Sequence, residues 1–280
     1  MLKIQSGARW PLRISLVVAF AFIIPGCHRQ SRLSDDNDVL YRRARQNIAD
    51  RRFMQAIRVL GDVGLITPIS DELDPKIKLA LADAHFYQPG TVNVVEAQSR
   101  YEQFISFYPT HDSAFYAKFQ VGACLLRQAE SPENDQEYSV RATRHFQQMV
   151  AELPDENPWR RAAQTMLIKA QENLAEHEWL VAKYYSDHEK WAGAIERLTR
   201  LVDSYSGSAR REEAFLSLAR ALVAAGDLDG ASAAIERMLR EYPDGPWAAT
   251  AQVLRDEITS ERVSQGSRAP LGDGAAGASF

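Results

Sequence analysis

The chain has 280 residues, of which 45% are hydrophobic and 25% charged, so it can bury a globular core and is neither collagen-like nor a polytopic membrane protein. Its formal net charge of −4 becomes −7 once the first 26 residues are set aside, because these contain three basic and no acidic side chains. A mature chain this acidic repels phosphate backbones, which argues against nucleic acid as a partner.

Residues 1–26 are predicted to be a secretory signal peptide. Three basic residues precede an apolar run, residues 14–24, which is 11 residues long. A membrane-spanning helix needs about 20 apolar residues, so this run is too short to cross a bilayer. The segment is therefore interpreted as a targeting signal for export rather than as part of the fold.

The apolar run ends in Ile24-Pro25-Gly26-Cys27, which resembles the lipobox of bacterial lipoproteins. The resemblance implies that the signal is cleaved before Cys27 and that this cysteine carries covalent lipid, with no other cofactor. Stable anchoring takes two or more acyl chains, as such a cysteine would provide. Because no Asp follows Cys27, the resemblance implies the periplasmic face of the outer membrane. The alternatives are cleavage after Ala21 and an uncleaved anchor.

Residues 27–37 are predicted to be a lipidated tether, and residues 38–258 form the body of the protein. In this body apolar residues recur at spacings of three and four, which is the helix period. Five alanines are each followed by large apolar residues four and seven positions later, and in four units by a proline twelve positions later, with Ser206 in the fourth unit. The five alanines are Ala56, Ala97, Ala142, Ala194 and Ala231.

This layout resembles tetratricopeptide (TPR) repeats, so we predict an all-α, TPR-like α-solenoid of about five helix pairs. The alanine lets the two helices of a pair approach closely, and the proline ends the second helix. The alanines are 41, 45, 52 and 37 residues apart. Because these spacings exceed the usual 34, we expect extended loops at residues 88–93 and 129–135.

The last segment, residues 259–280, is rich in Gly, Ala and Ser, and is predicted to be a disordered tail.

Two stretches identify a narrower resemblance. Residues 174–185, Leu-Ala-Glu-His-Glu-Trp-Leu-Val-Ala-Lys-Tyr-Tyr, followed by residues 191–197, Trp-Ala-Gly-Ala-Ile-Glu-Arg, resemble the BamD family, also called YfiO or ComL. Glu189 stands where that family usually has Gly. The resemblance implies a non-catalytic outer-membrane lipoprotein of the β-barrel assembly (BAM) complex. It would dock on POTRA domains of BamA, beside other BAM lipoproteins, and help to insert unfolded outer-membrane β-barrel proteins.

Two sets of candidate binding residues follow. Arg197 matches a family arginine associated with docking on BamA, and its alternative is an ordinary solvated helix arginine. Aligning the first helices of the first three pairs predicts a groove for extended peptides, whose aromatic side chains could instead fill the core between repeats. The groove candidates are Tyr41, Arg45, Asp83, Phe86, Tyr116 and Phe119.

The sequence contains no recognisable constellation for catalysis or for a metal ion, so no enzyme is predicted. Cys124, beside Leu125 and Leu126, is interpreted as a buried structural thiol. The arginine pairs that begin at Arg42, Arg160 and Arg210 are interpreted as solvated faces. The alternative functions are another periplasmic TPR adaptor lipoprotein, of the Tol-Pal, cell-division or pilus-assembly type, and a periplasmic hydrolase or its accessory.

Overall fold

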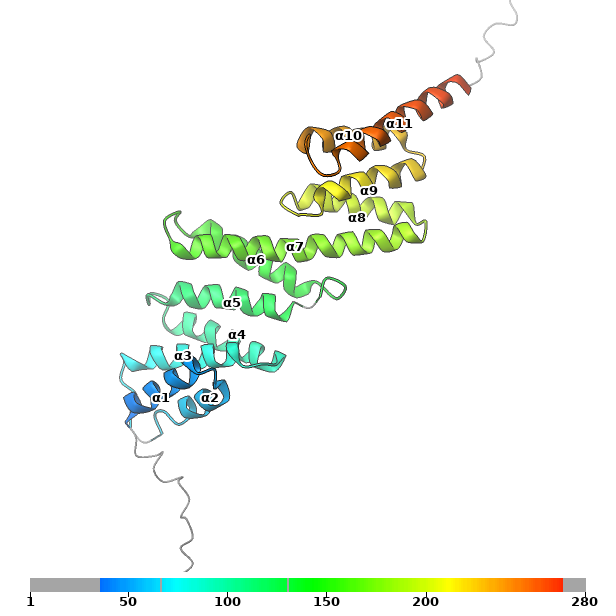
Figure 1. Ribbon diagram of the computed structural model, residues 1–280. Helices are drawn as coiled ribbons and strands as arrows, with labels where there is room; N and C mark the ends of the chain where they lie inside the picture. The colour runs from blue at the N-terminus through cyan, green and yellow to red at the C-terminus, as the bar shows by residue number, and fades with distance from the viewer. Residues whose placement is uncertain (1–35, 66, 130, 269–280) are drawn as a thin grey trace, which may run out of the picture.

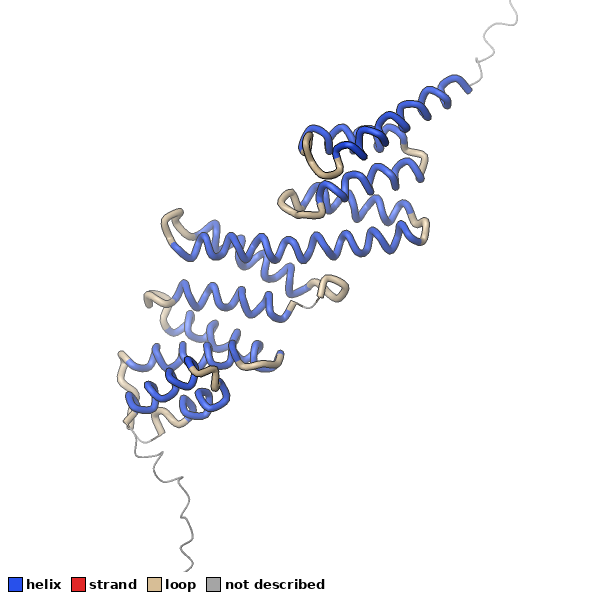
Figure 2. Tube along the Cα trace, in the orientation of Figure 1, coloured by secondary structure: helices blue, strands red, loops and turns tan. Residues whose placement is uncertain are grey.

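The computed structural model describes residues 36–65, 67–129 and 131–268, and within these ranges every regular element is an α-helix (Figures 1 and 2). The helices are α1 (Asn37–Ala49), α2 (Phe53–Gly61), α3 (Leu73–Tyr87), α4 (Thr91–Phe107), α5 (Ala114–Gln128), α6 (Glu137–Glu152), α7 (Pro158–Asp187), α8 (Trp191–Ser204), α9 (Arg211–Ala224), α10 (Leu228–Glu241) and α11 (Ala248–Arg268).

The helices stack in chain order. Each helix packs against its neighbours in sequence, and the stack runs from the α1–α2 hairpin at one end to α11 at the other (Figure 1). This is the arrangement of a solenoid, in which each repeat buries its apolar face only against the adjacent repeats. The predicted all-α solenoid of five helix pairs is therefore confirmed, with α7–α8 and α9–α10 as the last two pairs and α11 covering the end.

The repeated alanines occupy the helix crossings that the pattern predicts. All five are 0% exposed, and each lies in the buried stripe of the second helix in its pair. A larger side chain at such a position would collide with the facing helix. The residues four positions later fill the core of each pair, and all are almost fully buried: Leu60, Tyr101, Phe146, Leu198 and Ile235.

The extra length between repeats is only partly in loops. The eight residues between α5 and α6 form a long connection, as predicted for 129–135, but α3 and α4 are joined by the short turn 88–90, so the extended loop expected at 88–93 is wrong. The longest alanine spacing, between α6 and α8, is taken up by α7 itself, which has 30 residues. Asn157 caps its N-terminus and Pro158 occupies the first turn, where a missing N–H costs nothing.

The C-terminal boundary also differs from the prediction. The structure continues α11 to Arg268, so a disordered tail beginning at 259 is wrong for residues 259–268. Ile258 is buried against the C-terminal core, and Arg262 forms an ion pair with Asp229 of α10, so the helix is held beyond the predicted end. Residues 269–280, the signal peptide 1–26, the tether up to residue 35 and Cys27 lie outside the described residues.

None of the helices in the part of the chain that the structure describes combines the length and the apolar character needed to cross a bilayer.

Candidate functional site

The predicted groove residues lie on the first helices of the first three pairs, as the alignment of repeats requires. Arg45 is exposed, and the other five side chains are half-buried. Tyr41 and Arg45 come from α1, Asp83 and Phe86 from α3, and Tyr116 and Phe119 from α5.

Asp83 is the centre of a hydrogen-bonded network. The hydroxyl groups of Tyr101 and Tyr116 each donate to its Oδ1 at 2.6 Å, and Gln120 Nε2 donates to the Tyr116 hydroxyl at 2.8 Å. We call these four residues, Asp83, Tyr101, Tyr116 and Gln120, the Asp83 network. Two predicted ligand-binding groups, Asp83 and Tyr116, thus bind each other and join α3 to α5.

Burial controls the electrostatics of this network. Loss of solvent raises the pKa of Asp83 above its ordinary value, although the two tyrosine hydroxyls and the nearby charge of Arg45 act in the opposite direction. Burial, with the charge of Asp83 beside them, also raises the pKa of Tyr101 and of Tyr116. The tyrosines therefore stay protonated as donors.

The aromatic part of the predicted groove is organised by a residue that the sequence analysis missed. Trp159, in the first turn of α7, lies 5.5 Å from Tyr116 and 5.3 Å from Phe119 between ring centroids. Its backbone N–H donates to the Asn157 cap. The succession of a capping asparagine, a proline and an apolar residue is a helix-start signal from which this position could have been found.

Arg45 is close enough to Asp83 for its charge to act on that carboxylate, whereas Phe86 and Tyr41 stand apart from the Asp83 network. Phe86 lies under Arg127, whose guanidinium is 5.0 Å from the ring centroid and also donates to the Phe86 carbonyl. Tyr41 packs against the N-terminal core formed by α1, α2 and α3. The structure therefore brings together Asp83, Tyr116 and, through Trp159, Phe119.

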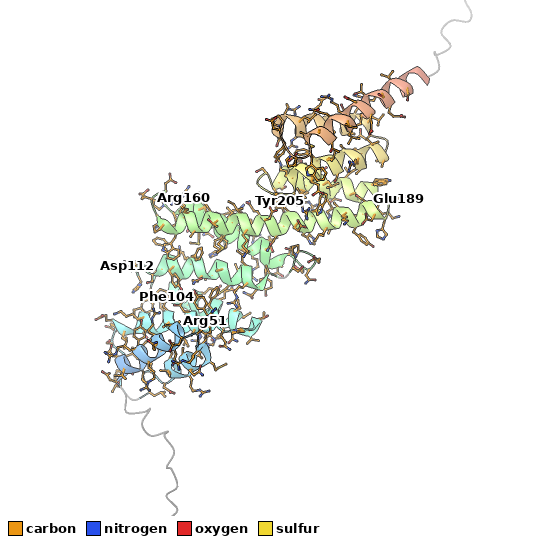
Figure 3. All side chains as sticks on the ribbon, viewed as in Figure 1. Arg51, Phe104, Asp112, Arg160, Glu189 and Tyr205 are labelled. Carbon is orange, nitrogen blue, oxygen red and sulfur yellow. The ribbon has the colours of Figure 1, made fainter. Side chains whose placement is uncertain are left out.

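Arg197 is one of two arginines that neutralise a buried carboxylate. Glu178 on α7 has only 8% of its side chain exposed, and it accepts from Arg197 Nη1 and from Arg200 Nη1 at 3.2 Å each. We call Glu178, Arg197 and Arg200 the Glu178 cluster. Tyr205 lies at the far end of α8 (Figure 3), and its pKa is raised by burial and by the charge of Glu178.

The sequence resemblance included both ends of this cluster, Glu178 and Arg197, but not their contact. The Arg197 side chain remains 28% exposed, so part of the guanidinium reaches solvent while one nitrogen holds Glu178. The interpretation of Arg197 as an ordinary solvated arginine is therefore wrong, because it has a structural partner. Its role toward another protein stays a prediction.

A hollow of about 440 Å³ lies between α7, α8 and α9, in the half of the solenoid for which no groove was predicted. Trp179 and Leu180 give it an apolar side. Arg210 crosses it, bound to both carboxylate oxygens of Glu176 at 2.8 and 3.0 Å and to Glu213 at 3.0 Å. A second concave surface therefore exists beside the Glu178 cluster.

Two further sequence predictions concern chemistry. Cys124 is 0% exposed, and burial raises the pKa of its thiol to about 12, which confirms a structural rather than a reactive thiol. Among the described positions, no three His, Cys, Asp or Glu side chains are placed so that they could hold a metal ion.

Comparison with known proteins shows that most of this chain matches one protein family. Residues 34–222 match the YfiO family, described as outer membrane lipoprotein, and residues 212–254 match a tetratricopeptide repeat. The outer membrane protein assembly factor BamD of Xylella fastidiosa (strain 9a5c) is 22% identical over 84% of this chain and 83% of its own length. BamD of Rickettsia prowazekii is 19% identical over 86% of this chain and 95% of its own. BamD of Buchnera aphidicola is 21% identical over 66% of this chain and 78% of its own length.

Proposed function

Because the chain belongs to the YfiO family of outer membrane lipoproteins, we propose that it is a non-catalytic scaffold of the β-barrel assembly complex, which helps to insert outer-membrane proteins. The observation that carries this proposal is the family match over residues 34–222, which runs through the stacked helices from α1 into α9. A solenoid suits the role, since its long concave side offers contact area to other polypeptides.

The proposed role requires binding surfaces rather than a reaction centre. The polar side chains at the two candidate sites are bound to one another, as in the Asp83 network and the Glu178 cluster. Such contacts hold neighbouring helices in register, and they support a scaffold more than a catalyst.

The proposed anchor is lipid on Cys27. Replacing Cys27 by Ser removes the acylated sulfur, and we expect the protein to move from the membrane fraction to the soluble periplasmic fraction. A Cys124→Ser variant is the matched control, because it removes the other cysteine, which is buried. Full retention of the Cys27→Ser protein in membranes would exclude the lipid anchor.

The proposed docking residue for the POTRA domains of BamA is Arg197. A guanidinium has five N–H donors in a planar fork, so one that holds Glu178 through a single nitrogen retains donors for a carboxylate of a partner. The partial exposure of the Arg197 side chain supports this assignment.

A pull-down of BamA from detergent-solubilised envelopes tests both the complex and the residue. We expect BamA to co-purify with the wild-type chain and to be recovered poorly with Arg197→Ala. Arg200→Ala is the control, because it removes the other arginine from the same carboxylate. If BamA is absent from the wild-type eluate, the proposed function is wrong. If the two variants lose BamA equally, the loss reflects the damaged Glu178 cluster and Arg197 is not the docking residue.

We assign the unfolded β-barrel clients to the aromatic surface around Trp159, where Tyr116 and Phe119 offer apolar contacts beside the polar Asp83 network. A photo-crosslinking amino acid at position 119 should capture nascent outer-membrane proteins. The same group at exposed Val263, at the far end of the solenoid, is the control. Equal capture at both positions would remove the clients from this surface.

A further inference from the structure

The α1–α2 hairpin differs in charge from the rest of the protein. Residues 36–61 contain six arginines and three aspartates, whereas residues 62–280 contain 22 basic and 33 acidic side chains. The first hairpin is therefore positive, and the remainder of the chain after it is strongly negative. Such an asymmetry gives a molecule a preferred orientation in the field of a charged surface.

The six arginines are all exposed. Arg43 of α1 and Arg58 of α2 line one hollow of about 300 Å³, together with the polar side chains of Asn47 and Gln55 and with Val59. The other four lie elsewhere on the same hairpin: Arg42 and Arg45 on α1, with the charge of Arg45 near Asp83 of α3, and Arg51 and Arg52 on the turn between the two helices. We call these six residues the arginine face.

Three of these side chains have no carboxylate within the described residues to neutralise them. Arg42, Arg51 and Arg58 form no ion pair with a carboxylate of the described residues. By contrast, Arg160, Arg210 and Arg211 each bind a carboxylate: Arg160 binds Asp155, Arg210 binds Glu176 and Glu213, and Arg211 binds Glu241. Of these three, only Arg211, with 8% of its side chain exposed, contradicts the interpretation as a solvated face.

The arginine face is also at the end of the molecule where the chain would leave the membrane. The hairpin is the first unit of the stack, and α3 covers only one of its sides (Figure 1). With lipid on Cys27, a part of the proposed function on which this step rests, Asn37 is ten positions after the anchor. Ten fully extended residues span at most about 35 Å, so the hairpin stays near the bilayer.

We propose that the arginine face binds the phosphate groups of anionic phospholipids and so orients the solenoid on the membrane. Basic side chains near such a surface are attracted by its negative potential, which decays within a Debye length of about 8 Å. The acidic repeats are repelled by the same potential. The two effects together turn the first hairpin toward the bilayer and the later repeats, with the Glu178 cluster, away from it.

Vesicle flotation of the unlipidated chain, residues 28–280, tests this binding apart from the anchor. All four core clusters are formed by residues between 40 and 258, so removal of the signal and Cys27 leaves the core complete. We expect binding to phosphatidylcholine vesicles that contain one quarter phosphatidylglycerol, weaker binding at 0.5 M salt, and no binding to pure phosphatidylcholine. Each arginine near an anionic surface changes the partition about fivefold. Arg43→Glu/Arg58→Glu should therefore lower binding by about 25-fold or more.

The matched control is Arg161→Glu/Arg220→Glu, which changes net charge equally at two exposed arginines of α7 and α9. It should bind like the wild type, and circular dichroism should show both variants folded. Three results would overturn the proposal: no binding of the wild type, equal binding to neutral vesicles, or equal loss in the two double variants. If any of these occurs while BamA still co-purifies, this inference alone fails and the proposed function stands.

Discussion

At the scale of single residues, Asp83 shows why a polar residue on a predicted groove can be structural. Its position on the first helix of a repeat was correctly predicted, but its partners come from α4 and α5. Tyr101 belongs to the alanine pattern as an apolar core residue, and its hydroxyl must bond to something because the whole side chain is buried. Asp83 is the acceptor that satisfies it.

Asp83→Asn should preserve the fold, because an amide oxygen can still accept from both tyrosines and the variant has no buried charge. Asp83→Ala should lower the free energy of unfolding by about 1–3 kcal/mol, since the Tyr101 hydroxyl then has no acceptor. Thermal unfolding at pH 7 measures the difference in stability between the two variants. Equal destabilisation by both substitutions would show that the charge itself is needed.

The pH dependence of this comparison has a defined sign. The pKa of Asp83 is raised in the folded state, so just above the ordinary value of 3.8 the folded protein binds more protons than the unfolded chain does. The contribution of Asp83 to stability is therefore full below pH 3.8 and is lost as the pH rises through the folded-state pKa. Relative to Asp83→Asn, the wild type should lose stability across this window, as measured by denaturant unfolding at stepped pH. A constant difference would contradict the raised pKa.

Glu189 carries backbone strain at the α7–α8 turn. Its φ is 55°, in the left-handed region, as is that of Arg51 at the α1–α2 turn, while the corresponding turn before α10 has Gly226 at 84°. All three positions lie two residues before the next helix begins. The sequence shows Glu189 as a departure from the family's glycine, and the structure supplies the reason why glycine suits the position.

Glu189→Gly should raise the free energy of unfolding by about 0.5–1 kcal/mol. A residue with a Cβ is strained in the left-handed conformation, and relief of this strain outweighs the additional conformational entropy that glycine gives to the unfolded chain. The control is Lys190→Gly, whose φ is −88°, and which should give no gain. The midpoints of thermal or denaturant unfolding measure the stability of both variants. A gain shared by the two variants would argue against relief of strain at residue 189.

At the scale of elements, the second helix of each pair was predictable and α7 was not. The alanine pattern reflects a steric requirement at the crossing of two helices within one pair. Because this requirement is local, all five repeats show it in their sequence. The full length of α7 has no such signature: its exposed face mixes polar side chains with Ile168 and Tyr184, and its buried alanines, from Ala163 to Ala182, serve two different cores. The contacts of Arg197 with Glu178 and of Trp159 with Phe119 depend on how adjacent pairs are rotated, which the sequence pattern leaves open.

Ala194→Phe tests the crossing of α7 and α8. Ala194 is 0% exposed, so a ring there overpacks the contact and should destabilise by about 1–3 kcal/mol. Ala192→Phe adds the same ring two residues earlier, on the exposed side of α8, and should change stability little. The melting temperatures of the two variants make the comparison. Identical values would contradict the helix-pair register.

At the scale of the whole molecule, α7 is the element that makes one solenoid from two groups of repeats. Ala163 and Ala170 belong to the core shared with α5 and α6, whereas Ala175 and Ala182 belong to the core that continues to α11. Figure 3 labels Arg160 near one end of this helix and Glu189 just past the other. The relative position of the aromatic surface and the Glu178 cluster therefore depends on a single unbroken helix.

Glu172→Pro would interrupt that helix between its two cores. Proline removes one helical hydrogen bond and clashes with the preceding turn, at a cost of about 3 kcal/mol or more, so the two groups of repeats should become less strongly coupled. Because solenoid repeats are stabilised by their neighbours, each group should keep its own core and unfold separately. Denaturant unfolding should then show two transitions where the wild type and the control Glu172→Ala show one. A single transition at the wild-type midpoint would mean that other contacts, such as that of His177 on the second half of α7 with the Pro132 carbonyl, rather than the continuity of the helix, hold the two groups together.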